Sequence, residues 1–145
     1  MRGLVQRVER AEVRVDGEVV GAIGAGLCVF VGVTHDDGDA EADRLGAKLA
    51  GLRILDDDAG VMNRSVVEVG GEVLLVSQFT LYGDTAKGRR PTWNAAAPPE
   101  QAKLLLDRVA EGLSATGLSV ATGRFGEYMV VELVNDGPAT LMVEV

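Results

Sequence analysis

The residues best suited to chemistry are the hydroxyl and amide side chains that follow an apolar run in the stretch VLLVSQFTLYGD, Val73–Asp84. We expect a strand over Val73–Phe79, in which successive side chains alternate between faces. Both faces then change from apolar to polar where Ser77, Gln78 and Thr80 are reached. This change predicts a buried strand whose end opens into a cleft. Alternatively, the two hydroxyls only bond to backbone at a strand end.

Side-chain proton transfer has few candidates in this sequence. The one histidine, His35, lies in an acidic loop far along the chain from Ser77 and Thr80, so a Ser-His-Asp hydrolase is hard to build. No Cys/His set suits zinc, and no glycine-rich phosphate loop lies between a strand and a helix. The acidic stretches His35–Asp37 and Asp56–Asp58 lack the glycine and distal glutamate of a calcium loop, and we interpret both as solvated loops. We therefore expect no metal and no cofactor.

A Gly-Pro pair, Gly137-Pro138, lies between two predicted strands, where a proline nitrogen cannot join a ladder. Together with the donors near Ser77, it suits binding and electrostatic stabilisation better than proton transfer.

The charge balance restricts the partners. The 145 residues suffice for one domain, 1–145, and carry a net charge of −8 with a pI near 4.6, which argues against a general polyanion binder. Lys87, Arg89 and Arg90 form the densest basic cluster, close to Trp93, within the long connection Tyr82–Pro99. This segment is either a solvated loop or a local phosphate-contacting patch.

The remaining composition indicates a cytoplasmic protein without a membrane partner. The single cysteine, Cys28, lies inside an apolar run and is interpreted as a buried thiol rather than a nucleophile. No signal-peptide core is present, and the most apolar stretch, Val19–Val33, falls short of the ~18 residues that a membrane span needs.

Alternation and turn residues predict eight strands, with Asp16-Gly17 and Gly70-Gly71 as hairpin turns. The expected strands are Gly3–Val15, Glu18–Ile23, Leu27–Val33, Val66–Val69, Val73–Phe79, Leu118–Thr122, Met129–Asn135 and Thr140–Val145.

Helical periodicity predicts two amphipathic helices. The first has Asp39 as its N-cap, and the second begins at Pro99 and ends by Gly117. Their apolar stripes are Ala42, Leu45, Leu49 and Leu52, and Ala102, Leu105, Leu106, Val109 and Leu113. The elements predict an α/β (mixed α+β) class.

Two motifs connect these elements to a known family. SQFTL at Ser77–Leu81 and NDGP followed by a threonine at Asn135–Thr140 are paired signatures of the D-aminoacyl-tRNA deacylases, which this sequence resembles. Further segments in the family's order are LVQRVERAEVRVDGEVVGAIGAGL, VMNRSV, GDTAKGRRPTW and TGRFGEYMVVELVNDGP. The resemblance covers the chain from end to end.

The resemblance implies a homodimer with a barrel-like mixed β-sheet flanked by two main helices. It implies hydrolysis of the ester that joins a D-amino acid, or glycine, to the 3′ end of tRNA. It also implies that Gly137-Pro138 is cis and reaches into the pocket of the other subunit. If its carbonyl oxygens face the substrate α-carbon, they exclude an L side chain without contacting the side chain that is accepted.

The resemblance also assigns roles around the strand end. Backbone N–H groups near Phe79 and Thr80 would stabilise the oxyanion, Ser77 and Gln78 would orient the adenosine and the ester carbonyl, and the terminal 2′-hydroxyl would assist. Thr80 as a nucleophile remains the alternative, although no base in the sequence obviously activates it.

Other residues are assigned less directly. Arg7 is either an exposed charge or, as the resemblance suggests, a side chain that fixes the Gly-Pro element. Met129 either lines the pocket or is plain core. The sequence departs from the family pattern at Ala139, where valine is expected, and at Glu127, which places a negative charge near a pocket for RNA.

Two other functions stay open. One is a non-catalytic module that binds the tRNA end, and the other is a small-ester hydrolase that uses Ser77 or Thr80. The expected partners are the aminoacyl-tRNA 3′ end and a second copy of the chain, with no DNA and no membrane.

Overall fold

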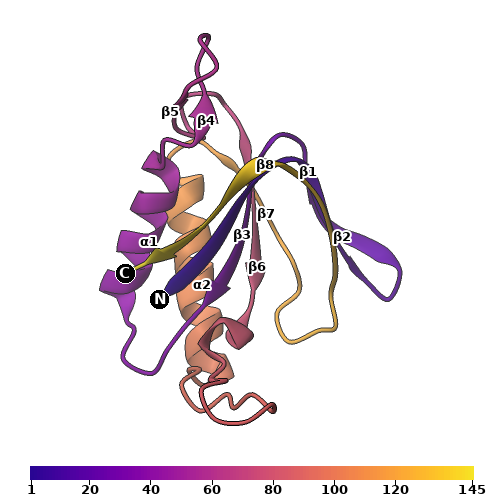
Figure 1. The fold of residues 1–145 in the computed structure, drawn as a ribbon, viewed down its shortest axis with the longest axis vertical. Coiled ribbons are helices and arrows are strands. Elements are labelled where there is room, and N and C mark those ends of the chain that lie inside the picture. The colour runs from indigo at the N-terminus through magenta and orange to yellow at the C-terminus, as the bar shows by residue number, and fades with distance from the viewer.

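A long first strand organises the sheet in the computed structural model, which describes residues 1–145 (Figure 1). The strands are β1 (Arg2–Val15), β2 (Glu18–Ile23), β3 (Gly26–Gly32), β4 (Leu55–Asp56), β5 (Met62–Arg64), β6 (Glu72–Ser77), β7 (Ser119–Thr122) and β8 (Val130–Glu144). The helices are α1 (Asp39–Gly51), α2 (Pro99–Ser114) and the 3₁₀ turn η1 (Phe79–Tyr82).

The main sheet is mixed and nearly closed. Its order is β2-β1-β3-β6-β7, with β8 paired to β1; β1 is antiparallel to its neighbours, whereas β3–β6 and β6–β7 are parallel. A Cβ at Gly21 on β2 would lie 2.3 Å from the carbonyl oxygen of Thr122 on β7, so the two end strands approach each other. The predicted α/β class with a barrel-like mixed sheet is confirmed.

The two helices lie side by side and cover one face of the sheet (Figure 1). The larger core cluster joins Leu45 and Leu49 of α1 and Val109 of α2 to Val29 and Leu75 of the sheet. A second cluster, which includes Val8, Ile23, Cys28, Leu74 and Val76, fills the other face. The strands β3 and β6 are therefore apolar on both faces, as the sequence predicted.

Several element boundaries differ from the predictions. The expected strand Val66–Val69 is a turn, because Ser65 and Glu68 bond reciprocally: Ser65 N–H donates to the Glu68 carboxylate (2.6 Å) and Glu68 N–H donates to Ser65 Oγ (3.2 Å). This S-x-x-E pattern is that of a capping box. The cap of α1 is Gly38 rather than Asp39, and the Gly38 N–H donates to Glu41.

The last two predicted strands form the single strand β8, with an irregular ladder to β1. Gln6 pairs with Thr140 and Val8 pairs with Asn135, so residues 136–139 of β8 lie opposite Arg7 alone. This insertion, called the β8 insertion below, carries the Gly-Pro pair. Its neighbours on both sides keep their pairing with β1.

Candidate active site

A cavity of about 870 Å³ opens where the parallel strands β3 and β6 end. Its lining is mostly apolar and includes Val31, Val76, Trp93, Leu106 and Phe125. The cleft predicted at the end of the SQFT strand is therefore present.

Ser77 and Gln78 both line this cavity. Gln78 N–H donates to the carbonyl oxygen of Val31 (2.8 Å), which extends the pairing one residue beyond β6. The chain then turns into η1, so Phe79 and Thr80 do not continue the strand as predicted. The amide of Gln78 donates to Thr80 Oγ, and Thr80 is not among the lining residues.

The turn η1 shapes one wall of the cavity. Phe79 is half exposed and its ring meets that of Trp93 edge-to-face, with centroids 5.5 Å apart. The first hydrogen bond of the turn runs from Leu81 N–H to the carbonyl oxygen of Gln78 (3.2 Å). The N–H groups of Phe79 and Thr80 come before it, at the end of the turn where N–H groups have no partner within the helix.

Contacts with β1 hold η1 in place. Arg2 Nη1 donates to the carbonyl oxygen of Leu81 (2.9 Å), and its guanidinium lies 4.5 Å from the centre of the Tyr82 ring. Burial, reinforced by the nearby carboxylate of Asp37, raises the pKa of Tyr82 to about 12. Tyr82 is therefore a neutral packing residue rather than an acid or base.

The facing wall comes from the segment before β8. Met129 lines the cavity and also packs against the second core cluster, so both interpretations of this residue hold. Glu127 lines the cavity too and is exposed. His35, Glu127 and Tyr128 are the only titratable side chains in the lining. None of the three belongs to a Ser-His-Asp set. The polar groups of this mostly apolar cavity therefore supply hydrogen bonds rather than a catalytic triad.

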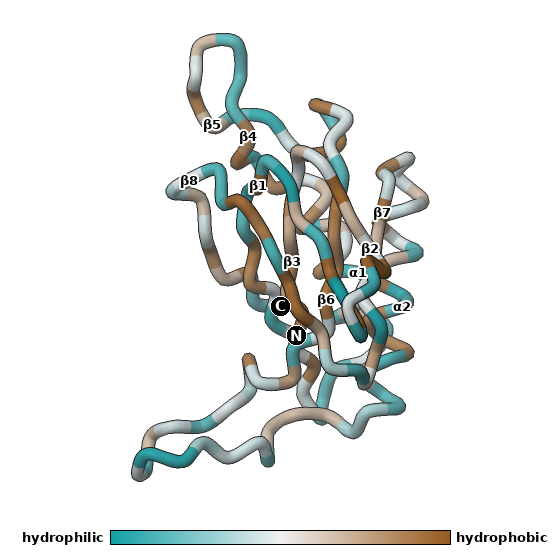
Figure 2. The backbone as a smooth tube through the Cα atoms, turned by 90° about the vertical axis from the view of Figure 1, so that its right-hand side faces the viewer, coloured by the Kyte–Doolittle hydropathy of each residue, from teal (hydrophilic) through white to brown (hydrophobic).

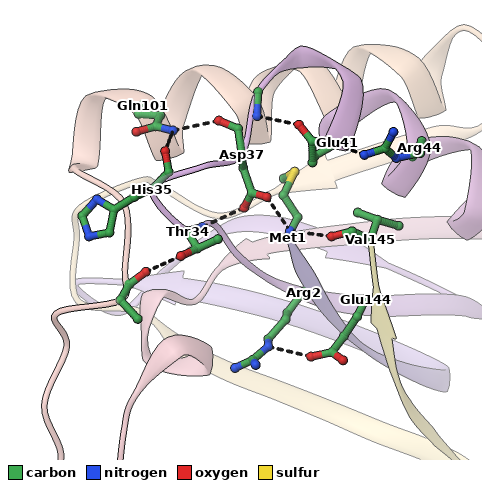
Figure 3. A network of polar contacts seen from close by, with 12 residues as sticks. Met1, Arg2, Thr34, His35, Asp37, Glu41, Arg44, Gln101, Glu144 and Val145 are labelled. Carbon is green, nitrogen blue, oxygen red and sulfur yellow. Dashed lines mark hydrogen bonds and ion pairs between the residues drawn. The ribbon is translucent and has the colours of Figure 1, made fainter.

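A buried ion pair anchors the rim (Figure 3). The N-terminal ammonium of Met1 contacts Asp37 at 2.7 Å, and both groups are almost fully buried. The second oxygen of Asp37 accepts the Thr34 N–H (2.8 Å), and Thr34 Oγ donates to the carbonyl oxygen of Ala95 (2.6 Å). Gln101 on α2 donates to the Asp37 carbonyl oxygen (2.8 Å). The interpretation of His35–Asp37 as a solvated loop holds for His35 and Asp36, which are exposed, but is wrong for Asp37, which is buried and partnered inside the protein.

The Gly-Pro pair lies far from this cavity within the same chain. Gly137-Pro138 is cis and exposed, and neither residue lines the cavity. The bend of β8 lies near β4 and β5, at the opposite end of the sheet from the segment between η1 and α2 (Figure 1). One chain therefore does not bring the two predicted halves of the site together.

Arg7 is buried and hydrogen-bonds to the β8 insertion, which is the contact that the second interpretation expects. Its side chain is 8% exposed; Nε donates to the carbonyl oxygen of Asp136 (2.8 Å) and Nη1 to that of Ile54 (2.8 Å). Asn135 Nδ2 donates to the Arg7 carbonyl oxygen (2.9 Å). The sequence motif could not show that this guanidinium joins β8 to the start of β4.

No group of three or more His, Cys, Asp or Glu side chains is arranged to hold a metal ion. Neither helix is long and apolar enough to cross a membrane.

Comparison with known proteins identifies the family. The profile of the D-Tyr-tRNA(Tyr) deacylase family matches residues 4–144. This chain belongs to that family. It is 59% identical to a D-aminoacyl-tRNA deacylase of Kineococcus radiotolerans, over 99% of both chains, and 58% identical to one of Heliobacterium modesticaldum, over 99% of this chain and 96% of that one. The resemblance drawn from SQFTL and NDGP is confirmed.

Solved structures share the fold. One named c-Myc DNA unwinding element binding protein superposes with a TM-score of 0.93 at 40% identity, over 100% of this chain and 99% of that one. A probable eukaryotic D-amino acid tRNA deacylase superposes with a TM-score of 0.86 at 19% identity, over 99% and 98%, and shows the fold alone. DNA binding is named for the first of these proteins only.

Proposed function

We propose that this protein hydrolyses the ester between a D-amino acid, or glycine, and the 3′ end of tRNA, and that it works as a cytoplasmic homodimer. The observation that carries the proposal is the cavity at the end of the SQFT segment in a chain that matches the deacylase family along its length. The lining combines apolar walls with Ser77 and Gln78, which suits a nucleoside and an ester held by a few polar groups.

Hydrolysis in this site rests on positioning. The attacking water and the ester carbonyl would be held in place, and the negative charge on the carbonyl oxygen would be stabilised by the N–H groups of Phe79 and Thr80. Ser77 and Gln78 orient the adenosine and the ester. The 2′-hydroxyl of the terminal adenosine assists, because no side-chain base faces the ester in a suitable triad.

Chiral selection is assigned to the β8 insertion of a second copy. Within one chain Gly137-Pro138 is exposed and remote from the cavity, yet Asp136 beside it is held by the buried Arg7. An exposed segment with a fixed backbone can present carbonyl oxygens to another subunit. β8 also pairs only with β1, so its other edge is free for a partner. A two-fold arrangement would place each insertion at the cavity of the other chain.

The decisive assay compares D-tyrosyl-tRNA, L-tyrosyl-tRNA, glycyl-tRNA and a simple D-tyrosine ester with the purified protein. Rapid release of D-tyrosine and glycine, with L-tyrosyl-tRNA spared, is the expected result. Binding without turnover would indicate a module that only holds the tRNA end, and equal turnover of the free ester would indicate a general esterase. A D-tyrosyl-tRNA that ends in 2′-deoxyadenosine should react slowly.

Chiral selection by the β8 insertion is tested with Gly137→Ala. A Cβ at this position would lie 2.7 Å from Asn135 Oδ1, so the Asn135 side chain, whose amide donates to the carbonyl oxygens of Arg7 and Ala139, must shift. We expect hydrolysis of L-tyrosyl-tRNA to rise relative to the D substrate. Gly112→Ala on α2, where a Cβ meets nothing within 4 Å, is the matched control. Unchanged chiral discrimination in Gly137→Ala would contradict the proposed role of the β8 insertion in chiral selection.

A further inference from the structure

Most cations of this acidic protein are already paired with carboxylates. Of its 14 Lys and Arg side chains, eight form ion pairs. The other six are Lys48, Arg53, Lys87, Arg89, Arg90 and Arg124. Three of these six lie within four consecutive residues, and all three are exposed. Unpaired positive charge is therefore concentrated in one segment.

This segment is a closed loop attached to the cavity wall. Asp84 and Thr92 exchange two backbone hydrogen bonds, of 2.9 and 3.0 Å, and we call the residues they enclose, with the pair itself, the basic loop (Asp84–Thr92). At its base, a Cβ on Gly83 would lie 2.6 Å from the ring of Trp93, which lines the cavity. A long loop with a hydrophilic tip projects from this end of the molecule (Figure 2).

A fourth unpaired cation lies beside the other wall. Arg124 precedes Phe125, which lines the cavity, and itself lines a smaller hollow of about 240 Å³. The two hollows share Ser77, Leu106, Phe125 and Met129. Positive charge without a carboxylate partner thus borders the site on two sides, while Lys48 and Arg53 lie on α1 and just beyond it.

The net charge of −8 makes this placement significant. Apart from Lys48 and Arg53, the Lys and Arg side chains outside this site are already paired with carboxylates. Free cations at a cleft raise the local concentration of an anionic ligand and speed its capture. Phosphodiester groups are the anions on the 5′ side of an aminoacylated terminal adenosine, and each cation placed against one releases counterions.

We propose that the basic loop, together with Arg124, binds the phosphates of the nucleotides that precede the terminal adenosine of the substrate tRNA. This inference rests on the proposed function and adds a second point of contact outside the cavity. The loop supplies affinity rather than chemistry, so its loss should raise KM and leave kcat unchanged. Binding by the basic loop also does not depend on the base sequence, since backbone phosphates are common to all tRNAs.

The test compares Arg89→Gln/Arg90→Gln with Lys48→Gln/Arg53→Gln, two double variants that change the net charge equally. On D-tyrosyl-tRNA at low salt, we expect roughly a tenfold fall in kcat/KM for the loop variant only. The slope of log kcat/KM against log salt should become shallower by about 1 to 2. On D-tyrosyl-adenosine, which has no phosphate, both variants should match the unaltered protein. Arg124→Gln should show a smaller loss of the same kind.

Direct binding of uncharged tRNA separates this inference from the proposed activity. The unaltered protein should bind tRNA more tightly than the loop variant, whether or not it turns substrate over. Equal tRNA affinity for the unaltered protein and the loop variant would overturn the inference, as would equal losses in both double variants. Failure of the unaltered protein to hydrolyse D-tyrosyl-adenosine and D-tyrosyl-tRNA would overturn the proposed function alone.

Discussion

The two ends of the sheet are built in different ways. At the cavity end, Asp37, Thr34 and Gln101 join the chain terminus, the loop after β3 and α2 into one buried network that is satisfied within the chain. At the other end, Arg7 on β1 donates to the Asp136 carbonyl oxygen of the β8 insertion, while Gly137-Pro138 stays exposed. One end is shaped to receive a ligand, whereas the other presents backbone outward. This difference is what the proposed site, shared between two copies of the chain, requires.

The largest effect is expected on the free energy of unfolding, when Asp37→Asn removes the buried ion pair at the cavity end. The variant leaves the buried ammonium of Met1 without its counter-charge, which costs about 3–5 kcal/mol for a buried pair. Chemical denaturation should show this loss of unfolding free energy. Asp39→Asn, whose partner Arg108 is a surface contact at 3.2 Å, is the control and should change stability by less than about 1 kcal/mol. Similar stability of both variants would contradict the buried network.

The next effect tests the other end with Arg7→Ala. The change removes donors from the carbonyl oxygens of Asp136 and Ile54, at about 1–3 kcal/mol for each oxygen left buried and unpaired. We also expect a rise in hydrolysis of L-tyrosyl-tRNA, because the insertion loses its fixed orientation. Arg10→Ala on the same strand, which breaks an exposed pair with Glu132, should preserve chiral discrimination. Loss of stability with unchanged discrimination would restrict Arg7 to a structural role.

A smaller effect concerns Cys28, in the sheet between the two ends. Burial raises the pKa of this thiol to about 12 from 9.0. The folded protein therefore favours the protonated thiol. The contribution of this thiol to the unfolding free energy is complete below pH 9 and is lost as the pH rises toward 12. Between pH 9 and 10 the unfolding free energy should fall by up to about 1.4 kcal/mol more than in Cys28→Ala. Equal slopes in both proteins would show that the thiol is accessible to water.

The smallest effect is expected for Thr80→Ala at the cavity end. The Thr80 hydroxyl accepts a hydrogen bond from Gln78 and does not line the cavity, so kcat on D-tyrosyl-tRNA should fall by no more than about threefold. Single-turnover assays would measure the chemical step directly. A loss of a thousandfold or more would instead identify Thr80 as the nucleophile.

Local sequence patterns predicted the sheet strands and both helices well. The continuous apolar runs of β3 and β6 follow from burial on two faces, and the stripes of α1 and α2 face one core cluster. The expected strand Val66–Val69 failed because reciprocal bonds between Ser65 and Glu68 favour a turn despite the β-branched residues. That signal was present in the sequence as S-x-x-E.

Candidate site residues were predicted from motifs, but their positions were not. Ser77, Gln78, Phe79 and Met129 do line one cavity. Alternation along a strand could not show that the chain turns after Gln78, where the Leu81 N–H bonds back to the Gln78 carbonyl oxygen. The role of Asp37 also escaped prediction, since its partner is the chain terminus, 36 residues away.

The β8 insertion occupies a strand whose pairing with β1 resumes on either side of it. The ladder that flanks residues 136–139 can therefore stay in register when a side chain of the insertion is exchanged, provided that Arg7 still holds the Asp136 carbonyl oxygen. Ala139, where the resemblance to the family leads us to expect valine, is buried and is one such exchange that the fold accommodates. On the proposed mechanism, small changes here would alter which aminoacyl groups the pocket of a partner subunit admits, without rebuilding the scaffold that carries the insertion.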